Sequence, residues 1–294
     1  MRRPSPQVGL PRLPVPLALA TIYLMWGSSY LGVSFALESY PPFLLSALRL
    51  FGCIVVLAGA LLLRGAALPG QKEIVSAAFL GTLMFSGAGL IALGQELGVS
   101  SGLTSVAVAA VVIWATIFAA LLGHCPGRLE LMGALIGIAG VALLNLEKGM
   151  QANPVGALVL LLGPMAWALG SMISNRMALP SGMMSLFFQM LGGFCALTLI
   201  GFLRGEQLPA NPAFPATAAL IYLSLFPTLL GFSAYMYLVR KVRPALATSY
   251  GYVNPVIAVL LGISLRAESI THIGLLAMAV IISGVLLVMM GKRR

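Results

Sequence analysis

The sequence contains very few charged residues and no aspartate at all. Of its 294 residues, 8% are charged and 60% are hydrophobic, and its only acidic residues are seven glutamates. A typical soluble domain has about 25% charged residues, so this chain offers too little polar surface to cover a soluble core. The mean hydropathy of +1.03 agrees with this. The composition therefore indicates an integral membrane protein and excludes a sizeable soluble domain.

The sequence also lacks the residues that would build a disulfide, metal or nucleotide site. Its three cysteines are odd in number, and two of them lie in apolar runs, so no disulfide framework is expected. Because no metal-ligand cluster, P-loop or dinucleotide fingerprint occurs, we expect no cofactor and no metal. The net charge of +10 would suggest nucleic acid as a partner of a soluble protein. In a membrane protein it reflects the positive-inside bias, so the expected partners are the lipid bilayer and a small-molecule substrate.

Apolar runs long enough to cross a bilayer, about 20 residues each, recur along the chain. Turn-forming residues such as Tyr40-Pro41-Pro42 and Pro180-Ser181-Gly182 separate them. The runs lack the period-two alternation of barrel strands, so the predicted fold is an all-α polytopic membrane protein. Its ten predicted transmembrane helices lie at approximately 17–37, 42–63, 74–94, 102–123, 129–146, 155–175, 183–203, 217–239, 245–265 and 271–290.

Lysine and arginine are distributed unevenly over the connections between these spans. Of the 17 basic residues, Arg49 lies within a span and Lys148, Arg204 and Arg266 lie on one side, while all the others lie on the opposite side. Because the side rich in Lys and Arg is normally cytoplasmic, the distribution predicts that both the N-terminus and the C-terminus face the cytoplasm.

The two halves of the chain resemble each other. The second span ends in Leu63-Arg64-Gly65 and the seventh in Leu203-Arg204-Gly205, 140 residues later, and Trp26 in the first span has a counterpart in Trp167 of the sixth. A repeat of five spans is odd, so its second copy enters the membrane from the opposite face. The sequence therefore predicts two inverted five-helix repeats, residues 1–148 and 149–294, as in many transporters.

Several short motifs occur in the order found in a known family: Trp26-Gly27-Ser28-Ser29-Tyr30, Val99-Ser100-Ser101-Gly102-Leu103, Pro244-Ala245-Leu246-Ala247, Asn254-Pro255, and Glu268 followed by Ile282-Ser283-Gly284-Val285. With them, the sequence resembles the drug/metabolite transporter superfamily, and within it the ten-span exporters with two EamA-type repeats. The resemblance covers nearly the whole chain. It implies a non-enzymatic secondary transporter in the cytoplasmic (inner) membrane of a bacterium, which exports amino acids, related metabolites or amphipathic drugs by alternating access. The first repeat departs from the family pattern, because span four has no proline to match Pro255.

Polar and aromatic side chains inside apolar runs are the candidates for substrate binding, because a polar group in hydrocarbon is costly unless it is paired or faces water. Tyr23, Trp26 and Tyr30 share one helix face by their spacing. The alternative is structural, with serines bonded to their own helix carbonyls and tyrosines anchored at the membrane interface. The predicted substrate-binding residues are Tyr23, Trp26, Ser28, Tyr30, Trp167, Ser171, Tyr250 and Asn254.

A second set of residues is predicted to couple or gate transport: Arg49, Gln95, Glu96, Pro164 and Pro255. Arg49 could form a structural ion pair with Glu38 or Glu96, contact a substrate carboxylate, or extend toward the membrane surface. Glu96 is a candidate titratable group or an ordinary loop residue. Each of the two prolines lies within a span and could bend it, because proline removes a helical hydrogen bond.

Two other functions fit parts of the sequence. Gly98-Val99-Ser100-Ser101-Gly102 matches the Gly-x-Ser-x-Gly motif of Ser hydrolases, with His272 on the same side, although that motif normally needs a strand-turn-helix elbow. A lipid-carrier flippase on the same fold would need basic headgroup contacts, for which only Arg49 is available deep in the membrane. The chain is expected to be a monomer or a homodimer. The Gly133-x-x-x-Gly137 pattern predicts helix packing within or between chains.

Overall fold

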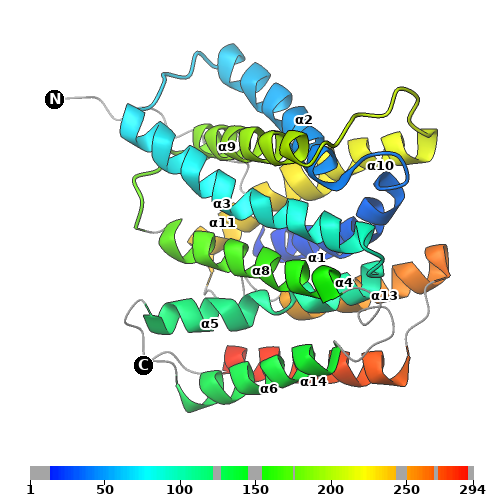
Figure 1. Ribbon diagram of the computed structural model, residues 1–294. Helices are drawn as coiled ribbons and strands as arrows, with labels where there is room; N and C mark the ends of the chain where they lie inside the picture. Colours follow the sequence, from blue (N-terminus) through cyan, green and yellow to red (C-terminus); the bar gives the residue numbers. More distant parts are fainter. Residues whose placement is uncertain are drawn as a thin grey trace.

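The computed structural model describes residues 14–121, 127–144, 154–174, 176–242, 250–267 and 271–290, and all of the regular structure in these residues is helical (Figure 1). The helices are α1 (Val15–Ala36), α2 (Pro42–Leu63), α3 (Gln71–Glu96), α4 (Ser101–Val108), α5 (Val111–Leu121), α6 (Arg128–Leu144), α8 (Pro154–Ser174), α9 (Gly182–Leu203), α10 (Phe214–Leu223), the π-helix η1 (Ser224–Gly231), α11 (Phe232–Lys241), α13 (Tyr250–Arg266) and α14 (His272–Met290). The predicted all-α fold is confirmed.

Five helical segments are each long and apolar enough to cross a membrane: α1, α2, α3, α9 and the continuous stretch Phe214–Leu238. Large apolar side chains such as Phe51, Val55 and Leu135 are exposed on the outside of the bundle. Contiguous exposed apolar surface of this kind marks contact with a membrane or a partner. The exterior of the protein is therefore suited to lipid, as the composition predicts.

Two of the predicted spans are composite helices rather than continuous ones. The span predicted at 102–123 is divided into α4 and α5 by a turn at Ala109 and Ala110, where the amide of Ala110 bonds the carbonyl of Ala107. The span predicted at 217–239 contains η1, with Pro227 inside it. Proline has no N–H to donate and its ring collides with the carbonyl four residues before it. The helix widens locally into a π-helix at this point.

The Leu-Arg-Gly repeat has the same local structure at both of its positions. Arg64 ends α2 and Arg204 ends α9, and the glycine that follows each of them has a positive φ, 57° at Gly65 and 74° at Gly205. Glycine is the usual residue for this left-handed helix end. The two copies nevertheless lie at opposite ends of the bundle. Arg64 contacts Met183 at the start of α9, whereas Arg204 contacts Glu96 at the end of α3.

Two faces of the bundle can be defined by these arginines. On the Arg204 face, α1, α3, α6, α9 and α13 end, and α2, α4, α8, α10 and α14 begin; on the Arg64 face, α2, α5, α8, α11 and α14 end, and α1, α3, α6 and α9 begin (Figure 1). Thus α1 ends where its counterpart α8 begins, and α2 begins where its counterpart α9 ends. The helices of the second half run in the opposite direction to their counterparts, which is the predicted inverted arrangement.

The helices of the two halves pack against each other through glycines. In α3, a Cβ at Gly81 would lie 1.8 Å from the carbonyl oxygen of Gln189 in α9, so the two backbones touch. At the opposite edge of the bundle, α6 and α14 lie side by side (Figure 1), and a Cβ at Gly284 would lie 2.6 Å from the backbone of Gly133 and Gly137. The Gly133-x-x-x-Gly137 pattern is therefore a packing face within the chain.

Candidate substrate cavity

A cavity of about 140 Å³ lies inside the bundle, where helices of both halves meet. An apolar cavity of about 150 Å³ can hold one benzene molecule, so this one can enclose a part of a solute the size of a single ring. Its lining residues are Trp26, Ser29, Tyr30, Val33, Ser46, Arg49, Leu50, Phe85, Gly87, Ala88, Ile91, Val108, Val111, Gly163, Pro164, Trp167, Leu197, Pro227, Thr228, Phe232 and Tyr250.

An aromatic cluster forms one wall of the cavity. Trp26 lies at its centre, with its ring centroid 5.8 Å from that of Trp167, 5.2 Å from that of Tyr235 and 4.7 Å from that of Tyr250. Phe232 contacts Trp167 and Tyr235. Edge-to-face contacts of this kind contribute roughly 0.5–1.5 kcal/mol each beyond area burial. We call these five residues, together with Phe85, the aromatic cluster.

The cavity lies between the aromatic cluster and the Arg204 face. Val33, Ser46, Ile91 and Leu197 line it, and each is within about two helical turns, roughly seven residues, of a helix end at that face. Trp26 and Phe85 lie near the middle of α1 and α3, and Trp167 and Tyr250 lie toward the ends of α8 and α13 that are farther from the Arg204 face. The aromatic cluster therefore separates the cavity from the Arg64 face.

The π-helix η1 fixes the position of Trp26. The indole Nε1 of Trp26 donates to the carbonyl of Pro227 at 3.0 Å. The thiol of Cys53 in α2 donates to the carbonyl of Ser224 at 3.1 Å, and the hydroxyl of Thr228 donates to the carbonyl of Leu223 at 2.7 Å. Backbone carbonyls of η1 thus accept hydrogen bonds from side chains of α1 and α2. Functional sites often contain such π-helical turns.

Four of the residues predicted to bind substrate line the cavity: Trp26, Tyr30, Trp167 and Tyr250. Ser28 does not, because its hydroxyl lies 2.6 Å from that of Tyr222 on a different side of α1. Residues 26 and 28 point about 200° apart on an α-helix, and the neighbouring Ser29 lines the cavity instead. Of the two serines, Ser29 and not Ser28 therefore adjoins the cavity.

The other three predicted residues lie behind the lining. Tyr23 is one turn before Trp26 and packs against the core from the side of the Arg64 face. Asn254 is 2% exposed and its amide makes no hydrogen bond of standard geometry with a described residue, although the hydroxyl of Tyr30 lies close enough to interact with it. Ser171 lies beside Tyr235 in the same way. These side chains support the aromatic cluster from behind.

Several lining residues have no strong signal in the sequence. Phe85 and Phe232 resemble any other core phenylalanine, and Ser46 is a single hydroxyl in an apolar run. Thr228 directly follows Pro227, and a proline inside a predicted span was the one available signal for this region. Of the predicted prolines, Pro164 lines the cavity, whereas Pro255 lies within α13 outside the lining.

Arg49 lines the cavity, and no acidic side chain in the described part of the chain is its partner. Its Nη2 donates to the hydroxyl of Thr228 at 3.2 Å, and its Nε has no hydrogen-bond partner among the described residues. Of the three alternatives for Arg49, the structural ion pair with Glu38 or Glu96 is not formed, because each of those carboxylates binds another arginine. Glu38 lies 2.7 Å from Arg266, and Glu96 lies 3.4 Å from Arg204.

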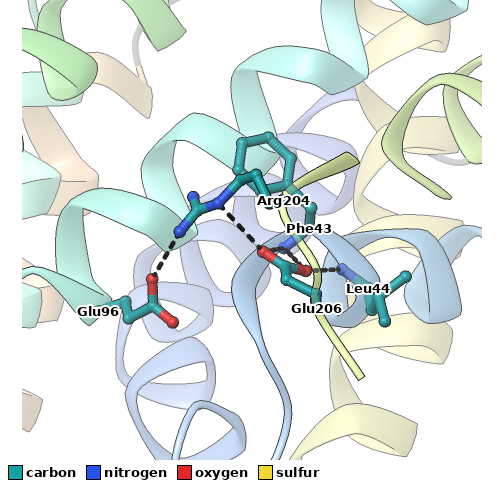
Figure 2. Close-up of polar contacts among 5 residues, drawn as sticks. All are labelled: Phe43, Leu44, Glu96, Arg204 and Glu206. Atoms are coloured by element: carbon teal, nitrogen blue, oxygen red, sulfur yellow. Dashed lines mark hydrogen bonds and ion pairs between the residues drawn. The ribbon is translucent and has the colours of Figure 1, made fainter. Parts of the chain in front are cut away.

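Interactions between the two halves connect the loops of the Arg204 face. Figure 2 shows Arg204 between two carboxylates, with Glu96 on one side and Glu206 on the other. The carboxylate of Glu206 also accepts hydrogen bonds from the backbone amides of Phe43 and Leu44 at 3.1 and 2.9 Å. These are unsatisfied N–H groups of the first turn of α2, whose own N-cap is a proline. A negative group at a helix N-terminus is stabilising.

The remaining predicted groups on this face do not reach the cavity lining. Glu96 is a half-exposed partner of Arg204, and Gln95 is 8% exposed with no hydrogen bond of its amide within the described chain. Several residues named from the sequence lie outside the described residues, namely Lys148, Pro244-Ala245-Leu246-Ala247 and Glu268.

Ser100 has a structural role in place of a nucleophilic one. Its hydroxyl accepts a hydrogen bond from the amide of Leu103 at 3.3 Å and so caps the N-terminus of α4. In the part of the chain that the structure describes, no hydrogen bond joins Ser100 to His272. The Gly-x-Ser-x-Gly motif links two helices here and does not form the elbow that the hydrolase motif needs.

These features define a class of protein. Two inverted halves enclose a cavity large enough for part of a small solute, inside a helical bundle whose exterior is apolar, as in secondary transporters.

The chain belongs to the EamA-like transporter family, whose model matches residues 14–146 and again residues 154–290. It is a transporter of the drug/metabolite transporter superfamily. It is 40% identical over 281 residues to the uncharacterized inner membrane transporter YedA of Escherichia coli (strain K12), covering 95% of this chain and 92% of that protein.

Two more distant similarities agree with this family. The chain is 25% identical over 284 residues to the probable terminal-alkyne amino-acid exporter of Streptantibioticus cattleyicolor, covering 94% of this chain and 95% of that protein. A crystal structure of a protein 22% identical in sequence has a TM-score of 0.67 and covers 93% of this chain and 95% of that one. The crystal structure shows that the fold is shared.

Proposed function

We propose that this transporter exports small amphipathic solutes, such as amino acids, related metabolites or amphipathic drugs, across the cytoplasmic (inner) membrane by alternating access. The observation that carries the proposal is the cavity between the two inverted halves, which combines an aromatic wall with hydroxyls and one arginine. A concave site that is mostly apolar with a few convergent polar groups is typical of small-molecule binding.

The arrangement of contacts suggests how the two sides of the cavity close. In this structure the aromatic cluster separates the cavity from the Arg64 face. Two ion pairs, Arg204–Glu96 and Arg266–Glu38, connect the first half to the second on the Arg204 face. In alternating access, the halves rock so that one of these barriers opens while the other closes. The aromatic cluster and the two ion pairs are the proposed gates.

The charges of the two faces support the proposed orientation. In the described residues, the Arg204 face carries two basic residues, Arg204 and Arg266. The Arg64 face carries more basic residues, namely Arg64, Lys72, Arg128, Arg176, Arg240 and Lys241. By the positive-inside rule, the Arg64 face is cytoplasmic. Solute would then enter the cavity when the aromatic cluster parts, and leave through the Arg204 face.

The choice of solute class and direction also draws on a relative. The Streptantibioticus cattleyicolor protein is named an amino-acid exporter, and its similarity extends over nearly the whole of both chains. The cavity volume is consistent with a solute of that size. A lipid-carrier headgroup is less well suited to a cavity of about 140 Å³ with one cationic side chain.

Replacing either cavity tryptophan tests this proposal. Trp26→Ala and Trp167→Ala remove a ring that lines the cavity, so each is expected to lower transport at subsaturating solute roughly tenfold, since one aromatic contact contributes roughly 0.5–1.5 kcal/mol beyond its area burial. Uptake of labelled amino acids into proteoliposomes measures the effect.

Trp114 provides a matched control. It packs on the core beside Phe118, outside the cavity lining, so Trp114→Ala should retain transport close to that of the native protein. Equal losses in all three alanine variants, or normal transport in the two cavity variants, would show that solute does not bind in this cavity.

A further inference from the structure

We infer that Arg49 binds the anionic group of the solute, so that this cavity selects amphipathic molecules with a single carboxylate and disfavours cationic ones. The inference rests on the proposed function, because it assumes that the transported solute occupies the cavity.

Of the described residues that line the cavity, Arg49 is the only charged one. It lies seven residues after the first residue of α2, about 10 Å along the helix at a rise of about 1.5 Å per residue, and thus within the span. A guanidinium carries five N–H donors. One hydrogen bond, from Nη2 to the hydroxyl of Thr228, is formed with a described side chain, and Nε is buried without a partner.

Among the residues that the structure describes, no acidic side chain is paired with Arg49. On the nearest face, Glu38 is paired with Arg266, and both Glu96 and Glu206 are held by Arg204. Within the described residues, Arg49 therefore has no ion pair. An unpaired cation at this depth is costly, and charged residues there usually face a water-filled cavity or a ligand pathway. An anionic solute would supply the missing partner.

One hydroxyl of the lining is available to complete an anion site with the guanidinium. Ser46 precedes Arg49 by one turn of α2, lines the same cavity, and is 2% exposed with its hydroxyl unpartnered among the described groups. The hydroxyl of Thr228 accepts from Nη2 at 3.2 Å and donates to the carbonyl of Leu223, so it holds the guanidinium in place. A carboxylate can accept two parallel N–H bonds from an arginine and a further bond from the hydroxyl of Ser46.

The charge of the cavity indicates which anions and which other solutes are favoured. A monocarboxylate cancels the single positive charge, whereas a dianionic phosphate leaves an uncompensated negative charge in a medium of low dielectric constant. A net cation meets Arg49 without a lining carboxylate to bind it. The aromatic cluster on the other side can receive an apolar or aromatic group, so the preferred solute has a carboxylate at one end and a ring or alkyl chain at the other.

Binding of two probes that differ only in charge tests the inference. Purified transporter in detergent is titrated with 3-phenylpropionate and with its neutral isostere 3-phenylpropanamide, and quenching of tryptophan fluorescence reports binding beside Trp26 and Trp167. The native protein is expected to bind the carboxylate at least tenfold more tightly. Hydrogen bonds to charged groups contribute about 1.5–3 kcal/mol, so Arg49→Gln should weaken binding of 3-phenylpropionate roughly ten- to hundredfold. The affinity for 3-phenylpropanamide should stay within about twofold of the native value.

Control variants separate a binding role from a structural one. Arg64→Gln removes an exposed arginine of the opposite face and should change neither affinity. Ser46→Ala leaves the charge of Arg49 in place, and it should weaken binding of 3-phenylpropionate by about two- to fivefold without changing binding of 3-phenylpropanamide. A variant that still binds 3-phenylpropanamide has a folded cavity. Arg49→Lys keeps the positive charge but loses the paired donors, so its affinity for 3-phenylpropionate should lie between those of the native protein and Arg49→Gln.

Several results would overturn the inference: equal weakening of both probes by Arg49→Gln, equal affinity of the native protein for both, no binding of either, or tighter binding of phenethylamine or phenyl phosphate than of 3-phenylpropionate. If any of these results is found while transport is normal and is lowered by Trp26→Ala, the role of Arg49 is refuted and the proposed function stands. If the protein binds 3-phenylpropionate more tightly than 3-phenylpropanamide but shows no transport that depends on Trp26, the proposed function is refuted instead.

Discussion

The two carboxylates that flank Arg204 should differ strongly in their contribution to stability, because Figure 2 shows Glu206 bonded to two backbone amides as well as to Arg204, and Glu96 bonded to Arg204. The side chain of Glu206 is 6% exposed, and that of Glu96 is 40% exposed. Glu206 also accepts the backbone amides of Phe43 and Leu44, whereas Glu96 bonds only Arg204 among the described groups. The perturbation is the same in both cases, a change to glutamine.

The expected magnitudes follow from these contacts. Two hydrogen bonds to a charged acceptor contribute about 1.5–3 kcal/mol each, and a neutral amide oxygen in Glu206→Gln can retain one bond of about 1 kcal/mol. Interaction of the carboxylate with the N-terminus of α2 adds about 0.3–1 kcal/mol. Water can replace part of this loss near the membrane surface, so Glu206→Gln should cost about 2–3 kcal/mol. Glu96→Gln should cost less than about 1 kcal/mol, as for exposed ion pairs in general.

Unfolding of the purified protein in mixed micelles, followed by circular dichroism during titration with SDS, measures both variants against the native chain. Equal losses for Glu96→Gln and Glu206→Gln would refute the reasoning, because they would show that Arg204 is the only partner of importance. A loss below about 1 kcal/mol for Glu206→Gln would show that water satisfies the start of α2 equally well.

Two further predictions concern helix packing and orientation. Gly81→Ala should reduce the amount of folded protein recovered from membranes, because its Cβ would overlap the carbonyl of Gln189. Gly59→Ala is the control and should have no such effect, because nothing lies within 4 Å of its Cβ. Equal recovery of the two variants would contradict the backbone contact between α3 and α9. In a cysteine-free background, Gln207→Cys should react with a membrane-impermeant thiol reagent in intact cells and Lys72→Cys only after permeabilisation, and the reverse labelling pattern would overturn the proposed orientation.

The substrate-binding prediction shows how far helix periodicity reaches in a membrane protein. Spacing placed Trp26 and Tyr30 on one face, and both line the cavity. It could not show that Ser29, in place of Ser28, accompanies them, because α1 is apolar on nearly all sides and lacks the polar stripe that identifies the exposed face of a soluble helix. Only the neighbouring helices, with Tyr222 beside Ser28, separate the two serines.

The partners of the charged residues were also beyond prediction. The sequence offered Glu38 and Glu96 as possible partners of Arg49, but these carboxylates pair with Arg266 and Arg204, which belong to the other half of the chain. Spacing in the sequence carries no information about such contacts. The contacts of the π-helix could not be predicted either. A proline at position 227 predicts a disturbed helix, but it does not predict which side chains bond to the backbone carbonyls there.

The sequence by itself determined the membrane environment, the positions of most helices and the inverted relation of the two halves. These properties follow from local quantities: the lengths of apolar runs, the prolines and glycines at helix ends, and the order of a repeat with an odd number of spans. For α2, the predicted limits 42–63 are those observed. Only the tertiary structure decided which side chains surround the cavity and that Glu38 and Glu96 pair with other arginines than Arg49, because both depend on how helices distant in the sequence are rotated against one another.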